Sequence, residues 1–364
     1  MNSTIPQPSR LRVFAAGVKK LTLILTLPCI LSVSNVLAES KHVSGGAVVV
    51  ETGSSYDDSD STRALWVDGN STSYTGTDIT LSGTNTSTSY YDAVAYVSSG
   101  SLSLTGGSIT ANTTGYTGSG KFGILVYGGG NTTLSGVDIV ATGDGSGPTA
   151  GIGNISSYGH IQVNLNNNIL LGDNYSIVVA SLTNTGTAST ITVTGSNGSL
   201  ISGSVYAITY GIVEITLTGA DTILHGDLIN VNTYMNDINL TLGDGASLYG
   251  GGVATNLTLN DGAILGYTDG LTVTTSITVG DNITIDFSSL TETGEYTVLD
   301  WSSVSSSGDI TAAQFTATGD GVEGTFSVAN NQLTFNATAV PEPSTWFLIG
   351  VGLGALALIR RRSS

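Results

Sequence analysis

An internal repeat is the strongest constraint on how this 364-residue chain folds. Three segments between residues 63 and 140 align without a gap at a spacing of 30 residues. Equivalent positions carry three glycines and three isoleucines: Gly76, Gly106, Gly136, Ile79, Ile109 and Ile139. Periods of about 20 to 50 residues are typical of solenoids, in which each unit buries its apolar face only against its neighbours. We therefore expect the three isoleucines to stack as an internal apolar ladder.

Later segments repeat at a shorter period and alternate apolar with hydroxyl side chains. LTLGDGASL at residues 240–248 recurs as LTLNDGAIL at residues 257–265, which is 17 residues further on. Such alternation predicts strands with one buried face, and the intervening Gly, Asn-Gly and Asp-Gly predict turns. We therefore predict a right-handed parallel β-helix, with a β-sandwich as the alternative fold.

The predicted organisation places this solenoid at residues 62–290. Residues 39–61, which precede the first clear repeat, are predicted to be an N-terminal loop or cap. Residues 291–339 are richer in aromatic side chains, and we predict a β cap there that covers the last open coil.

The N-terminal 38 residues have the pattern of a secretory signal peptide. Arg10, Arg12, Lys19 and Lys20 precede an apolar run at residues 21–33. A cleavage site between Ala38 and Glu39 follows, so signal peptidase and the general secretory machinery are expected partners. The only cysteine, Cys29, lies inside this segment, so the exported part has no disulfide or thiolate site.

The C-terminal segment, residues 340–364, joins three features in a fixed order. A Pro-Glu-Pro triplet precedes an apolar run at residues 346–359, and three arginines follow it. The apolar run predicts a short transmembrane helix, and the basic cluster resists crossing the bilayer. The residues of this predicted sorting signal are Pro341, Glu342, Pro343, Arg360, Arg361 and Arg362.

This tail resembles the PEP-CTERM sorting signal of Gram-negative bacteria. The resemblance implies an exosortase-type enzyme that recognises the Pro-Glu-Pro triplet and cuts near it. It also implies a transient anchor in the inner membrane, followed by release to the cell surface or the extracellular matrix.

The body of the chain resembles the β-helical passengers of autotransporters and adhesin-like repeats. The L-T-L-x-D-G-A-x-L units and the stretch GEYTVLDW at residues 294–301 carry this resemblance. The chain departs from autotransporters at its end, because the sorting-type tail stands in place of an outer-membrane barrel.

The expected exported body, residues 39–340, is strongly acidic. It contains 26 acidic residues and three basic ones, Lys41, Arg63 and Lys121, for a net charge of −23. Such a surface disfavours nucleic acid, because phosphate binding needs lysine and arginine. We expect no cofactor, although diffuse binding of Ca²⁺ is compatible with this charge.

The sequence shows no convincing catalytic or metal site. His42, His160 and His225 are not at metal-ligand spacing, and we interpret them as turn or surface residues. Asp57, Asp58 and Asp60 precede the first repeat and are interpreted as part of a solvated loop. A lyase on a β-helix would need Arg or Lys, which are missing between residues 122 and 359.

These observations favour a non-enzymatic surface or matrix protein with a structural or adhesive role, in contact with extracellular polysaccharide. A glycoside hydrolase built on a carboxylate pair is one alternative function. A passive spacer or sheath protein is the other.

Overall fold

A computed structural model describes residues 40–58, 63–84, 92–112, 121–143, 149–181, 188–231, 236–268, 270–304 and 308–340. All of them belong to one compact unit, Val36–Ser364. The predicted signal peptide with its Ala38–Glu39 cleavage site, and the sorting signal from Pro341 onward, lie outside the described residues.

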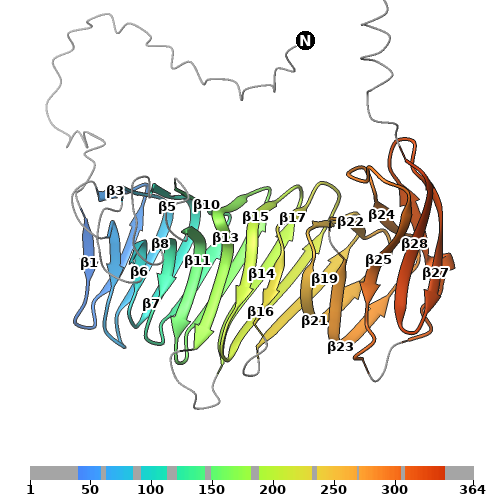
Figure 1. Cartoon of the computed structure of the whole chain (residues 1–364). Coiled ribbons are helices and arrows are strands. Elements are labelled where there is room, and N and C mark those ends of the chain that lie inside the picture. Colours follow the sequence, from blue (N-terminus) through green and yellow to red (C-terminus); the bar gives the residue numbers. More distant parts are fainter. Residues whose placement is uncertain are drawn as a thin grey trace, which may run out of the picture. The chain divides into compact units, whose positions relative to one another are not determined.

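The described residues form a parallel β-solenoid, as predicted from the repeats (Figure 1). The first coil consists of β1 (Lys41–Val43), β2 (Val48–Thr52) and β3 (Ser55–Asp58). β1 pairs in parallel with β4 (Leu65–Val67), whereas β2 and β3 both pair in parallel with β5 (Ser73–Thr84). The alternative β-sandwich is therefore wrong. Residues 41–58, which we expected to be a loop or cap, contribute the first coil.

Three ladders of strands run along the solenoid. The first contains β1, β4, β6 (Asp92–Val97), β8 (Lys121–Val126), β11 (Thr149–Ser156), β13 (Ile169–Ser181), β15 (Leu200–Ala207), β18 (Leu228–Asn230), β21 (Gly252–Leu259), β23 (Leu271–Val279) and β25 (Gly294–Asp300). The second contains β2, β5, β7 (Ser101–Asn112), β9 (Asn131–Ser135), β12 (His160–Asn166), β14 (Ser189–Ser196), β16 (Gly211–Thr218), β19 (Asp237–Gly243), β21 and β23. The third contains β3, β5, β7, β10 (Asp138–Thr142), β13, β15, β17 (Ile223–His225), β20 (Ser247–Tyr249), β22 (Ile264–Gly266), β24 (Ile283–Asp286) and β26 (Phe315–Thr318). The longer strands bend and serve two ladders.

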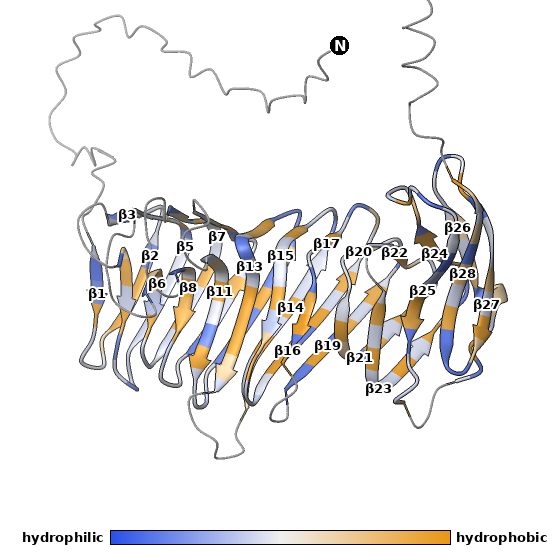
Figure 2. Cartoon of the chain, viewed as in Figure 1, coloured by the Kyte–Doolittle hydropathy of each residue, from blue (hydrophilic) through white to orange (hydrophobic). Residues whose placement is uncertain are grey.

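The core follows from the alternation of side chains along each strand. In β16, Val213, Ile215 and Leu217 are buried, whereas Glu214 and Thr216 between them are exposed. Apolar residues recur in this way along the strands of the solenoid (Figure 2). Each fully buried aliphatic side chain contributes about 1.5–3 kcal/mol, so stability accumulates coil by coil.

The predicted isoleucine ladder is partly wrong in its register. Ile109 pairs with Ile139, as expected, but Ile79 lies opposite Gly107 and Leu81 occupies the place opposite Ile109. The turn after β4 spans residues 68–72, whereas the turn after β6 spans only residues 98–100. The shorter turn moves the later strands two residues relative to a gapless alignment. Because side chains alternate with period two, all three isoleucines still face inward and are buried.

The 17-residue repeat has the predicted register. Leu240 pairs with Leu257, and Leu248 pairs with Leu265. The turn between the two paired stretches has the same length in both coils, residues 243–246 and 260–263, so here the alignment of the sequence is also the alignment of the strands.

The C-terminal end of the solenoid changes from parallel to antiparallel pairing. After a short 3₁₀ helix, η1 (Ala312–Gln314), β27 (Glu323–Ala329) pairs antiparallel with β28 (Gln332–Ala339), and β28 pairs antiparallel with β25. Phe287, fully buried after β24, stacks on Phe335 of β28 with ring centroids 4.2 Å apart. The antiparallel strands thus pack onto the end of the core.

Candidate functional site

The outward-facing side chains of the first ladder form one column along the solenoid. The column runs from β4 to β25 and continues onto β28. It contains Trp66, Tyr96, Leu125, Gly153, Val178, Tyr206, Ile229, Val253, Thr272, Asp300 and Gln332. The surroundings of these side chains differ between the two halves of the solenoid. In the N-terminal half several members are buried in an apolar cluster, whereas in the C-terminal half the column lines an open groove.

The groove consists of two adjoining hollows of about 470 and 370 Å³. Gly270 and Thr272 line both of them, so the hollows adjoin along β18, β21, β23 and β25. Three glycines, Gly251, Gly252 and Gly270, contribute to the lining, and the lack of side chains there leaves room for the hollow.

One end of the groove is formed by two tyrosines. Tyr267 and Tyr296 meet edge to face, with ring centroids 5.6 Å apart and an interplanar angle of 73°. The Tyr296 hydroxyl donates a hydrogen bond of 2.6 Å to the Glu292 carbonyl, which fixes the ring. Aromatic rings of this kind present an apolar surface beside polar groups.

Carboxylates and amides supply the polar part of the groove. Asp300 accepts hydrogen bonds from the Ser302 backbone N–H at 2.9 Å and from Gln332 Nε2 at 3.0 Å. The Ser302 N–H is the main cause that lowers the pKa of Asp300, so this carboxyl stays ionised. At the other end, Asp227 accepts a hydrogen bond of 3.0 Å from the Gly251 N–H.

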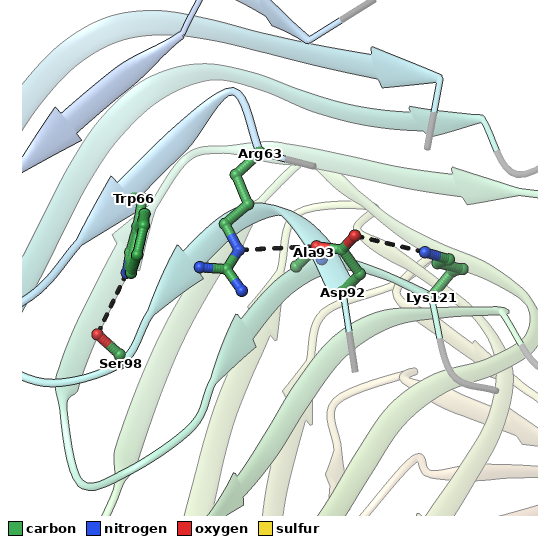
Figure 3. A network of polar contacts seen from close by, with 6 residues as sticks. All are labelled: Arg63, Trp66, Asp92, Ala93, Ser98 and Lys121. Atoms are coloured by element: carbon green, nitrogen blue, oxygen red, sulfur yellow. Dashed lines mark hydrogen bonds and ion pairs between the residues drawn. The ribbon is translucent and has the colours of Figure 1, made fainter. Parts of the chain in front are cut away.

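A buried ionic cluster lies on the N-terminal strands of the first ladder (Figure 3). Asp92 lies between two cations, with Lys121 Nζ 3.5 Å from Oδ2 and Arg63 Nε 3.7 Å from Oδ1. Only 1 % of the Asp92 and Lys121 side chains is exposed. Burial is the main cause that lowers the pKa of Lys121, against the opposing attraction of Asp92.

Aromatic rings complete this cluster. The Arg63 guanidinium carbon lies 3.6 Å from the centre of the Tyr96 ring and 4.5 Å from that of Trp66. Trp66 Nε1 donates to Ser98 Oγ at 3.2 Å. The remaining basic residue of the described chain, Lys41, pairs with Glu51 at 2.7 Å. Every lysine and arginine in the described part of the chain therefore has a carboxylate partner, and this cluster serves packing.

The structure keeps the three histidines apart, on β1, β12 and β17. His42 stacks on Trp66 with ring centroids 4.0 Å apart, and His225 meets Tyr249 edge-on at 6.5 Å. His160 Nδ1 lies within hydrogen-bond distance of Thr190 Oγ1. Among the described residues, no three His, Cys, Asp or Glu side chains gather in a way that would hold a metal ion.

Of the acidic cluster before the first repeat, Asp57 lies on β3 and accepts a hydrogen bond of 2.9 Å from Ser82 Oγ. It therefore belongs to a strand of the first coil, and not to a free loop. Asp60 lies outside the described residues.

Sequence reasoning missed the groove entirely. Its residues come from positions 227 to 332, and each is unremarkable in its own segment. The nearest signal in the sequence is the run of glycines at residues 250–252.

Comparison with known proteins identifies the C-terminal tail. Residues 339–362 match the PEP-CTERM protein-sorting motif, as the sequence suggested. This motif implies an exported, surface-sorted protein that is processed by an exosortase-type sorting enzyme. No curated protein matches the chain. The predicted membrane segment, residues 346–359, lies outside the described residues, and within those residues no helix is long and apolar enough to span a bilayer.

Proposed function

We propose that this protein is a non-enzymatic structural or adhesive component of the cell surface or extracellular matrix, and that it binds extracellular polysaccharide. The groove on the first ladder carries this proposal. Its direction follows the solenoid axis, because it crosses successive strands of one ladder. Four strands at about 4.8 Å spacing extend over roughly 15 Å, which suits a short stretch of an extended polymer.

The chemistry of the lining supports a carbohydrate ligand. Sugar hydroxyls donate to carboxylate and amide oxygens, which Asp227, Asp300 and Gln332 offer, and the Tyr267–Tyr296 pair offers apolar ring surface. The net charge of the expected exported body, residues 39–340, is −23, so an anionic polymer would be repelled. We therefore expect a neutral or amine-bearing polysaccharide.

The state of Asp300 makes it unsuited to be the proton donor of a glycoside hydrolase. A glycoside hydrolase needs one carboxyl that keeps its proton at working pH, and such groups have a raised pKa. The pKa of Asp300 is lowered instead, because a backbone N–H and Gln332 stabilise the ionised form. This carboxylate is suited to accept hydrogen bonds from a ligand.

A bulky side chain in the middle of the groove should weaken polysaccharide binding. We expect Thr272→Arg to weaken affinity for the bacterium's own exopolysaccharide at least tenfold, or about 1.4 kcal/mol, because the arginine fills the space shared by both hollows. Co-sedimentation with the polymer measures this. Thr216→Arg is the matched control, since Thr216 is an exposed threonine on β16, on another ladder.

Two results would contradict this assignment. Release of reducing ends that disappears in Asp300→Asn would indicate a hydrolase. If neither the wild type nor the Thr216→Arg control binds any neutral or amine-bearing polysaccharide, the result would indicate a passive spacer.

The sorting signal makes a separate prediction about processing. Mass spectrometry of the exported protein should find an N-terminus at Glu39 and no residues beyond the region of Pro341, Glu342 and Pro343. An exported form that retains Arg360, Arg361 and Arg362 would instead indicate a plain membrane anchor.

A further inference from the structure

The N-terminal edge of the solenoid has three strands that pair on one side only, within the described residues. β1 pairs with β4, and β2 and β3 pair with β5. The Ala47 carbonyl accepts from Ser73 N–H and the Gly53 N–H donates to Thr77 O, both at 2.9 Å. Because alternate residues of a strand point their backbone groups to opposite sides, those of Val48, Val50 and Thr52 face away from β5.

β2 also carries the most exposed aliphatic side chains of the described chain. Val48 is 74 % exposed and Val50 is 72 % exposed, on a strand of sequence VVVET. Natural edge strands are protected by lysine, proline, bulges or inward-pointing charges. β2 has no lysine or proline: its exposed positions carry Val48, Val50 and Thr52, and its one charged residue, Glu51, is partly buried. The one lysine of this coil, Lys41, is held by Glu51. An edge of this kind is suited to pair with another strand.

We propose that two copies of this protein associate head to head through their first coils. A second copy supplies a coil edge with the same three-strand shape. A two-fold axis perpendicular to the solenoid reverses the order of the strands around the coil. β2 then pairs antiparallel with β2 of the second copy, while β1 of each copy meets β3 of the other.

Two features of the strands support this arrangement. Val50 is the central residue of β2 and its backbone groups face the free edge, so the two-fold axis passes between the two Val50 residues. The crossed β1–β3 pairs join strands of similar length, Lys41–Val43 and Ser55–Asp58.

The two ends of the solenoid differ in a way that limits assembly. The C-terminal coil is covered by antiparallel β28 and β27, whereas no strand among the described residues pairs with the outer edges of β1, β2 and β3. An isologous contact at one end closes on itself, so the expected product is a dimer and not a filament. This inference is independent of polysaccharide binding by the groove.

Cysteine cross-linking tests the contact directly, because the only cysteine, Cys29, lies in the predicted signal peptide. Val50→Cys in the exported protein should give a disulfide-linked dimer under mild oxidation, since paired antiparallel residues have Cα atoms about 5.5 Å apart. Thr75→Cys is the matched control, because Thr75 is exposed, pairs with Val50 one coil further in and should give no cross-link.

Sedimentation should show a doubled mass for the wild type, and at least a tenfold weaker dimer for Val50→Lys, which places two lysines opposite each other. Thr75→Lys should remain dimeric, and circular dichroism should show that both variants are folded. A monomeric wild type at tens of micromolar, or a dimer that Val50→Lys leaves unchanged, would overturn the proposal.

Discussion

Replacing Asp92 by alanine should lower the free energy of unfolding by about 3–5 kcal/mol. The reason is the burial of its partner: only 1 % of the Lys121 side chain is exposed, and its ammonium lies 3.5 Å from the Asp92 carboxylate. Removal of this carboxylate takes away the charge that offsets the desolvation of the ammonium, and Arg63 loses its ion pair as well. Urea denaturation followed by circular dichroism measures the effect.

The loss of stability caused by Asp92→Ala should become smaller as the pH rises. The pKa of Lys121 in the folded protein is below its ordinary 10.5, mainly through burial, and removal of Asp92 should lower it further. Between the folded and unfolded pKa values the unfolded chain binds more protons, so stability rises with pH there. We expect the difference between Asp92→Ala and wild type to shrink as pH increases toward 10.5.

A double variant separates lost charge from lost packing. Asp92→Leu together with Lys121→Met removes both buried charges and keeps apolar volume, so it should recover most of the stability. A loss below about 1 kcal/mol for Asp92→Ala alone would mean that the cluster is far better solvated than its burial indicates.

Replacing Phe287 by alanine should cost about 3–5 kcal/mol, the usual range for a large buried aromatic residue. Phe287 is fully buried and stacks on Phe335 at 4.2 Å, so it joins the end of the third ladder to the antiparallel cap. Hydrogen exchange should therefore increase most in β24, β26 and β28, and least in the coils around β7. Thermal unfolding measures the total loss.

The neighbouring Phe326 provides the control for this prediction. It also contacts Phe287 and Phe335, with ring centroids 6.1 and 4.9 Å away, but its side chain is only partly buried. Phe326→Leu should cost less than about 1.5 kcal/mol. Equal losses in the two variants would contradict the central position assigned to Phe287.

The class of fold was predictable because the solenoid depends on local patterns. Apolar side chains in β16 alternate with hydroxyl and carboxylate side chains, and units such as residues 240–248 and 257–265 recur in register. A chain with this pattern buries its apolar face only when its internal repeats stack on one another. The sorting tail was predictable for a similar reason, since its three features are contiguous and match a known motif.

The register of the first coils could be determined only from the tertiary structure. Ile79 differs from its expected place because the turn after β6 is shorter than the turn after β4, and a gapless alignment hides such a change. The groove, the Asp92 cluster and the first-coil edge also join side chains or strands that lie many residues apart. Strand alternation and repetition are properties of a segment, so the sequence alone determined that this chain stacks into coils. Which side chains meet across the coils depends on the length of every turn between them, and only the folded structure decided that.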